Sequence, residues 1–203
     1  MATFNEVSLR RKCQNAMAAK KFTDIAYSKA ENKFDKNVNK LMTDFEEHEV
    51  TKELRYGGLS NNSELISKGN LFSFLGFYKD ENPATDLKQY LKNTIEMDNK
   101  PKITIEQNKV LYGFKVKTPS MNQINNEPLF KLEWTGRSWI QIVEKGVGNA
   151  AKYIFWSLGF GSPPSRSGTG LQLTNGKEAK NPATFKPMTY VSELLQEFKE
   201  MFS

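Results

Sequence analysis

The residue types that most often carry catalytic or metal chemistry are scarce in this chain of 203 residues. It contains one histidine, His48, and one cysteine, Cys13. A single imidazole excludes every mechanism that needs two, including zinc hydrolysis by an H-E-x-x-H motif. A single thiol excludes an intrachain disulfide and any zinc site built on cysteines. Cys13 falls on an apolar helical stripe, so we interpret it as a small core residue.

Acidic residues surround the single histidine. They are Asp44, Glu46, Glu47 and Glu49. At the end of a helix these carboxylates would point in several directions, whereas a metal ion needs ligands that converge on one point. We therefore predict no metal site. We expect His48 instead to close the C-terminal end of a helix, where a positive charge is favoured.

Two glycine-containing segments resemble phosphate-binding loops. Residues 146–151 fit the pattern G-x-G-x-x-A, but that fingerprint needs a βαβ unit and an acidic residue about 20 positions later. The next acidic residue is Glu178, so a helix end followed by a turn is the better interpretation. Residues 168–170 read Gly-Thr-Gly without the Gly-Lys-Ser/Thr of a P-loop, and the hydroxyl side chains beside them lack a nearby base. We predict no enzymatic activity and no cofactor.

Aromatic and arginine side chains provide the candidate interaction sites, because Trp, Tyr and Arg dominate binding at protein interfaces. Two tryptophans flank an arginine in residues 134–139. The alternative is a buried tryptophan pair with the arginine as a structural hydrogen-bond donor. A second arginine stands alone among small residues in a long loop, and its guanidinium suits pairing with a carboxylate. The candidate interface residues are Trp134, Arg137, Trp139, Arg166, Phe72 and Phe74.

The chain carries 29 basic and 23 acidic residues, a formal charge of +6. The excess is +2 in each of residues 1–60, 61–150 and 151–203. Nucleic-acid-binding proteins concentrate their basic residues on one face, because phosphate charges are neutralised locally. The even distribution favours a solvated surface, with a basic nucleic-acid-binding module as the alternative. No apolar signal segment and no run of about 18 apolar residues is present, so we expect a soluble protein made in the cytosol.

The elements that would position these residues begin with a long helix. Residues 1–56 contain no Gly or Pro, and apolar residues recur there at helical spacing. They are Tyr27, Ala30, Phe34, Val38, Leu41 and Phe45. A continuous helix of about 40 residues would be about 60 Å long, so part of it should project or pack against another copy. The alternative is two helices with a break near Lys20–Thr23.

The remainder of the chain alternates between short helices and strands. An aromatic run with turn signals on both sides predicts a strand. Asn82-Pro83 then predicts the start of a helix, and alternating apolar residues after it predict a hairpin. A third strand, a short helix capped by Ser138 and stopped by Gly146, and a docked terminal helix follow. The predicted ranges are strand 71–77, helix 83–97, hairpin 103–116, polar loop 118–128, strand 129–134, helix 139–145, loop 159–182 and helix 189–201.

These elements predict an α+β fold, with a small antiparallel β-sheet flanked by helices, a long N-terminal helix and a C-terminal helix. We divide the chain into a long N-terminal helix, residues 1–55, and an α+β domain, residues 56–203. The Gly/Pro loop of residues 159–182 belongs to the second unit, and its length is typical of functional loops.

Four segments resemble the neck proteins of tailed bacteriophages, in the group of tail-completion and head–tail connector proteins. In that group a helical N-terminus leads into a segment of the form F-x-x-H-x-V-T-x-E-[IL], and a small sheet carries the rest. The segments that carry the resemblance are residues 44–54, 69–77, 136–139 and 165–172.

The resemblance implies a structural virion protein without enzymatic activity or cofactor. Such a protein would form a homo-oligomeric ring, six- or twelve-fold, at the head–tail junction and join the portal or connector to the tail. Its partners would be other neck, portal and tail proteins, with non-specific contact to DNA in the channel and no membrane. A tail terminator that caps the tail tube is the alternative within the same group.

Overall fold

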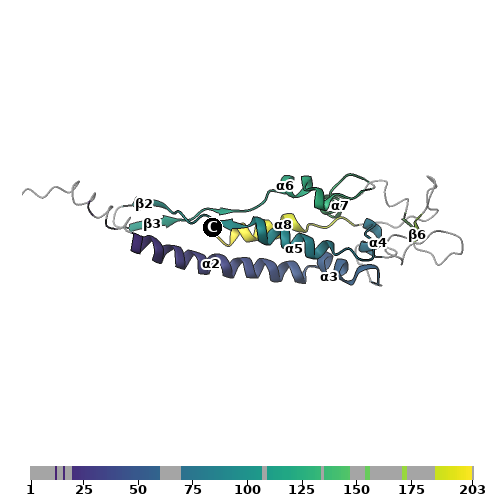
Figure 1. Ribbon diagram of the computed structural model, residues 1–203, viewed down its shortest axis with the longest axis horizontal. Coiled ribbons are helices and arrows are strands. Elements are labelled where there is room, and N and C mark those ends of the chain that lie inside the picture. Colours follow the sequence, from purple (N-terminus) through teal and green to yellow (C-terminus); the bar gives the residue numbers. More distant parts are fainter. Residues whose placement is uncertain are drawn as a thin grey trace, which may run out of the picture.

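The computed structural model describes residues 12, 16, 20–59, 70–106, 109–133, 135–146, 154–155, 171–172 and 186–202. The predicted α+β class is confirmed, since a long N-terminal helix and shorter helices accompany antiparallel strand pairs. In Figure 1 the molecule is elongated, and α2 runs along one side of it. Among the described residues, no helix is long and apolar enough to cross a membrane.

The helices and strands have the following bounds. The helical elements are α2 (Lys20–Glu47), α3 (Glu49–Tyr56), η1 (Gly57–Leu59), α4 (Leu71–Leu75), α5 (Pro83–Thr94), α6 (Met121–Asn126), η2 (Pro128–Phe130), α7 (Trp139–Lys145) and α8 (Val191–Glu200). The strands are β1 (Glu96–Met97), β2 (Lys102–Glu106), β3 (Lys109–Gly113), β4 (Val116–Lys117), β5 (Ile154–Phe155) and β6 (Leu171–Gln172).

The predicted N-terminal helix is interrupted at His48, the residue expected at a helix end, and a second helix follows at once. The His48 backbone is extended, with φ −64° and ψ 137°, and its Nδ1 accepts the N–H of Val50 at 3.2 Å. His48 is therefore the N-cap of α3, which starts a new helix. From Lys20 onward α2 continues for 28 residues, about 42 Å, without a break near Thr23. Of the residues before Lys20, the structure describes two, Lys12 and Ala16, both helical.

The strand predicted over residues 71–77 is wrong, because Leu71–Leu75 form helix α4. The Asn70 side chain accepts the N–H of Ser73 at 2.8 Å and caps the start of the helix. Gly76, at φ 79°, ends it in the left-handed conformation. Every residue of α4 is buried, so its apolar run has no polar side that would have revealed a helical period.

The predicted hairpin is confirmed, and it belongs to a longer antiparallel ribbon. β2 pairs with β3, with Ile103 opposite Tyr112, and β1 pairs with β4. The predicted turn at residues 107–108 lies outside the described residues. Helix α5 begins at Pro83 behind the Asn82 cap as expected, but it ends at Thr94 because the chain enters β1.

The strand predicted over residues 129–134 is also wrong. Residues 128–130 form the 3₁₀ turn η2, and a single bridge joins Lys131 to Ser138. The loop predicted at residues 118–128 contains α6, which begins with a capping box formed by Ser120 and Gln123. In each case side-chain and local backbone hydrogen bonds decide the conformation, and apolar alternation does not.

The last part of the chain follows the sequence more closely. Helix α7 starts at the Ser138 cap and stops at Gly146, and α8 forms the predicted terminal helix. Within the predicted loop of residues 159–182 the structure describes the strand β6, which pairs with β5. The other residues of that loop lie outside the described residues.

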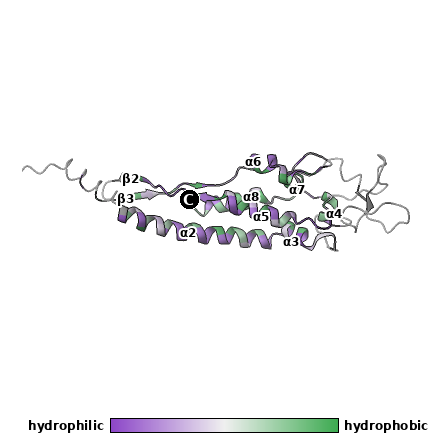
Figure 2. Cartoon of the chain, viewed as in Figure 1, coloured by the Kyte–Doolittle hydropathy of each residue, from purple (hydrophilic) through white to green (hydrophobic). Residues whose placement is uncertain are grey.

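One apolar core joins α2, α3, α4, α5, α7 and α8. The C-terminal end of α2 supplies Leu41 and Phe45, so the predicted N-terminal unit and the predicted α+β unit share this core. Figure 2 shows hydrophilic and hydrophobic bands alternating along α2, whereas α4 is mainly hydrophobic. The N-terminal half of α2 extends beyond the core beside β2 and β3 (Figure 1). There the Tyr27 ring packs edge-on against the Phe114 ring, with the ring centroids 5.8 Å apart.

Candidate functional site

Tyr190, directly before α8, is the fully buried centre of an aromatic cluster. The Phe45 ring stacks on it at 5.9 Å, the His48 ring lies at 4.6 Å and the Trp139 ring at 6.3 Å. Its hydroxyl and the Thr51 Oγ1 are 2.6 Å apart. Residues from α2, α3 and α7 thus meet at Tyr190, which ties the C-terminal segment to residues 45–51 and to α7.

The buried pair of hydroxyl groups is a structural contact. Burial strongly raises the pKa of Tyr190, and the hydrogen bond with Thr51 offsets only part of that effect. The Tyr190 phenol is therefore neutral throughout the physiological pH range. One of the two hydroxyl groups donates a hydrogen bond to the other, and neither can act as a base. This contact links positions 139 residues apart in the sequence.

His48 is neutral in this environment, which corrects the predicted helix-closing cation. Burial lowers its pKa, while a hydrogen bond to the Thr189 backbone and the nearby Glu193 carboxylate act in the opposite direction without reversing it. Its Nδ1 must also keep a free lone pair to accept the N–H of Val50. The histidine follows the last residue of α2 but serves the start of α3.

Two glutamates of residues 44–54 also hold the fold together. The Glu46 carboxylate forms ion pairs with Lys88 of α5 and with Arg55 of α3. Burial alone would raise the pKa of Glu46, but the hydrogen bonds from these two cations outweigh it and lower the pKa. Glu53 is 7% exposed and accepts the backbone N–H of Leu71 at 2.5 Å, which caps α4 together with Asn70.

The structure places the predicted interface residues in three different settings. Phe72, Phe74 and Trp139 are 2%, 2% and 1% exposed, so they belong to the core. Trp139 meets Phe77 edge-on at 6.0 Å, which agrees with the buried alternative for this tryptophan. Arg137 is exposed, and its backbone carbonyl accepts a hydrogen bond at 2.9 Å across the turn. Two members of the set, Trp134 and Arg166, lie outside the described residues.

Of the seven large apolar side chains that are exposed among the described residues, four lie in α2, β2 and β3, and the other three are Tyr56, Tyr78 and Leu129. We use the name arm for residues 20–33 of α2 together with β2, β3 and the residues directly beside these strands, 100–101 and 114–115, which lie at one end of Figure 1. Its exposed apolar side chains are Phe22 at 50%, Ile25 at 48%, Ile103 at 37% and Leu111 at 44%. Phe22 and Ile25 are off the stripe that begins at Tyr27, a mismatch that the sequence could have revealed.

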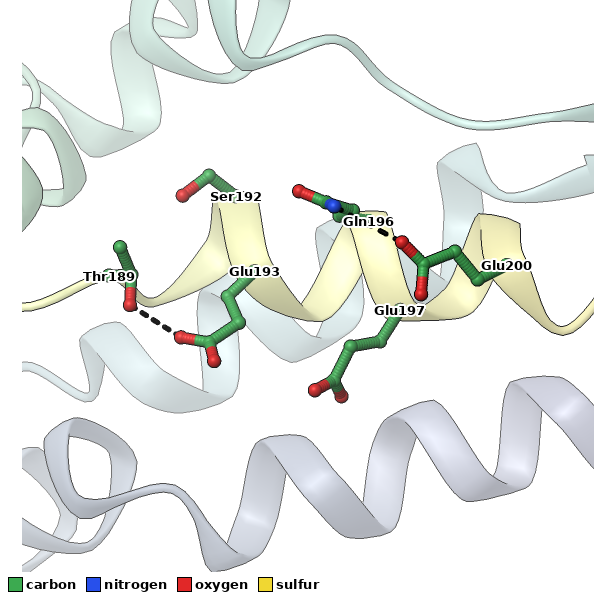
Figure 3. A pocket seen from close by; sticks show the side chains of 6 residues that line it. All are labelled: Thr189, Ser192, Glu193, Gln196, Glu197 and Glu200. Carbon is green, nitrogen blue, oxygen red and sulfur yellow. Dashed lines mark hydrogen bonds between the residues drawn. The ribbon is translucent and has the colours of Figure 1, made fainter.

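A shallow acidic groove lies along α8. It has a volume of about 420 Å³, and the described residues that line it include no lysine or arginine. Figure 3 shows that Glu193 and Glu197 point to one side of α8, while Ser192 and Gln196 point to the other. Thr189 donates to the Glu193 carboxylate, and the Gln196 amide donates to Glu200 at 3.1 Å. The lining residues are Thr189, Ser192, Glu193, Gln196, Glu197 and Glu200.

These carboxylates do not form a metal centre. Within the part of the chain that the structure describes, no group of three or more His, Cys, Asp or Glu side chains is placed to hold a metal ion.

The chain was compared with known proteins in three ways. No protein-family model matches it, and neither the curated proteins nor the solved structures include one that is detectably similar. No function can be transferred from a relative on this basis.

Proposed function

We propose that this chain is a structural subunit of the neck of a tailed bacteriophage. It would form a ring at the head–tail junction that joins the portal or connector to the tail, and it would have no catalytic activity. The resemblance of residues 44–54 and 69–77 to neck proteins motivates this proposal. The arm, with apolar side chains exposed at the end of an elongated molecule, is the observation that carries it.

The contacts of the resembling segments support a structural role. Phe45, His48 and Thr51 surround Tyr190, and Glu53 caps α4. In an enzyme, a distinctive motif would bring polar groups together at an accessible cleft. Here the polar side chains of the motif form hydrogen bonds with backbone groups at helix ends and with Tyr190. The motif therefore supports a structural role.

The arm supports assembly. Large apolar side chains that one subunit leaves in water are stabilised when a neighbouring subunit covers them. A ring built from identical subunits provides such a neighbour for every copy. The proposed role therefore accounts for both the buried motif and the exposed arm.

The experiment that tests the proposal is imaging of particles made with and without this protein. Intact virions should contain the protein by mass spectrometry, and particles lacking it should be filled heads without attached tails. Overlong tails in its absence would support the tail-terminator alternative. Absence of the protein from purified virions would contradict the proposal.

A basic nucleic-acid-binding module is the second candidate, and the lysines of the ribbon favour it. Lys100, Lys102 and Lys115 are exposed on or beside β2 and β3. A gel shift that weakens steeply with salt would support this function. No shift even at low salt would exclude it.

A further inference from the structure

The ribbon in the arm is incompletely covered by its own chain. Ile103 lies opposite Tyr112, and Leu111 lies opposite Thr104, so Ile103 and Leu111 are on opposite faces of the ribbon. A single helix, α2, can cover only one of these faces. Both side chains are exposed, Ile103 at 37% and Leu111 at 44%. The ribbon therefore presents apolar surface on both faces.

The edges of this ribbon are also open. Within the described residues, β2 pairs only with β3, so each strand has one edge without a strand partner. A two-stranded sheet in water is marginally stable unless a helix or another strand supports it. Open edges and exposed apolar faces together indicate a segment that is completed by another molecule.

The charge of the ribbon indicates what kind of molecule completes it. The ribbon from residue 96 to residue 117 carries five lysines and three acidic residues, a net charge of +2. Lys117 is paired with Asp98 at 2.5 Å, whereas Lys102 and Lys115 have no ion pair with any described residue. Two arms placed face to face would therefore bring like charges together. Such contacts are unfavourable at an interface.

The α8 groove has the opposite charge. Residues 189–200 carry three glutamates and one lysine, a net charge of −2. Met201 and Phe202 follow the C-terminal end of α8 and are half-buried, and the Phe202 ring packs against Phe34 and Phe198 with the Lys33 ammonium over it. The same chain thus has a basic projection with exposed apolar side chains and an acidic groove along α8.

We propose that the arm of one copy docks onto the α8 groove of a second copy of this chain. The contact joins two different surfaces, so each copy offers a free arm and a free groove for further copies, and repetition closes into a ring when the rotation allows. This inference rests on the proposed ring function and specifies its subunit contact. Lys102 and Lys115 would face Glu197 and Glu200.

The test uses charge reversal in the full-length chain. The arm variant is K102E/K115E, and the groove variant is E197K/E200K, placed near the helix C-terminus, where lysine is favoured. Each variant alone should assemble at least about tenfold more weakly than the wild type by sedimentation velocity. An equimolar mixture should recover assembly, because every contact in an alternating ring is again complementary.

The matched control is K79E/K92E, which reverses two exposed lysines outside the arm and should assemble as the wild type does. Thermal unfolding of each variant separates loss of contact from loss of fold, and the recovery in the mixture cannot come from an unfolded protein. A monomeric wild type, or variants that assemble unchanged, would overturn the docking contact.

Two further outcomes separate this inference from its alternatives. If the arm variant loses DNA binding but retains assembly, the arm contacts nucleic acid and the docking contact is wrong. If rings persist in all variants while the protein is present in virions, the docking contact fails and the proposed function stands. If the mixture recovers assembly but the protein is absent from virions, the docking contact stands and the proposed function fails.

Discussion

The core around Tyr190 and the arm differ in how completely the chain satisfies its own groups. Around Tyr190, aromatic rings are buried, hydroxyl groups are paired, and helix ends are capped by His48 and Glu53. In the arm, Phe22 and Leu111 remain in water, and strand edges are open. The core is therefore complete within one chain, whereas the arm leaves apolar side chains and strand edges uncovered by the described residues.

The largest expected effect of a single substitution is in the core. Trp139→Ala should lower the free energy of unfolding by about 3–5 kcal/mol, because it empties a large fully buried site. Urea denaturation followed by circular dichroism measures this loss. Trp139→Phe, which keeps an aromatic ring against Phe77 and Tyr190, should cost less. A loss below about 1 kcal/mol for the alanine variant would place Trp139 outside the essential core.

The next effect concerns the buried hydroxyl pair. Thr51→Val and Tyr190→Phe should each cost about 1–3 kcal/mol, because each leaves one buried hydroxyl without its partner. The double variant should cost less than the sum of the two single changes, since it leaves neither group unpaired. The four unfolding free energies form the cycle that checks this. Simple additivity would mean that the two hydroxyls do not interact.

A smaller effect should appear as pH is lowered. The folded-state pKa of His48 is below its ordinary value of about 6.5, so the unfolded chain takes up this proton more readily. Stability should therefore be complete above about pH 6.5 and should decline as the pH falls through the folded-state pKa. Protonation of Nδ1 also removes the lone pair that accepts the N–H of Val50, and with it the cap of α3.

Unfolding measurements between pH 5 and 8 test this effect, and His48→Asn is the matched control because asparagine can cap a helix without titrating. The wild type should lose more stability than this variant over the range. Parallel curves for the two proteins would show that His48 is not the titrating group.

The smallest effect on stability is expected in the arm. Leu111→Ser should change the free energy of unfolding by no more than about 0.5 kcal/mol, because the side chain is 44% exposed. It should nevertheless weaken self-association measured by sedimentation. Leu91→Ser, in the buried part of α5, is the contrasting change, which should lower the free energy of unfolding by several times as much. Equal assembly by wild type and Leu111→Ser would remove the arm from the interface.

Local signals predicted much of the fold correctly. The cap at Asn82, the cap at Ser138 and the stop at Gly146 depend on side chains and backbone angles within a few residues. Alternation across β2 and β3 also identified the hairpin, because the cross-strand partners are close in sequence. These elements need no knowledge of the rest of the molecule.

The errors have a different physical origin. Leu71–Leu75 are buried on every side, so apolar content could not distinguish a helix from a strand, although Asn70 and Gly76 supplied cap signals. Phe130 and Leu132 alternate as in a strand, but local hydrogen bonds fold this segment into a turn.

The candidate site was less predictable than the fold. Aromatic type alone suggested an interface at Phe72, Phe74 and Trp139, whereas burial depends on contacts made across the whole chain. The contact between Thr51 and Tyr190 spans 139 positions and leaves no local pattern. The sequence could have shown that Phe22 and Ile25 are off the apolar stripe, whereas the exposure of Ile103 and Leu111 depends on how α2 and the ribbon lie side by side.

The most direct test of the difference between core and arm is amide hydrogen exchange of the wild-type chain at low and high protein concentration. The account predicts that amides of α3 and α8 are protected at both concentrations, whereas amides of β2 and β3 become protected only when the protein assembles. Equal protection of the ribbon at both concentrations would contradict it, because the arm would then be complete within a single chain.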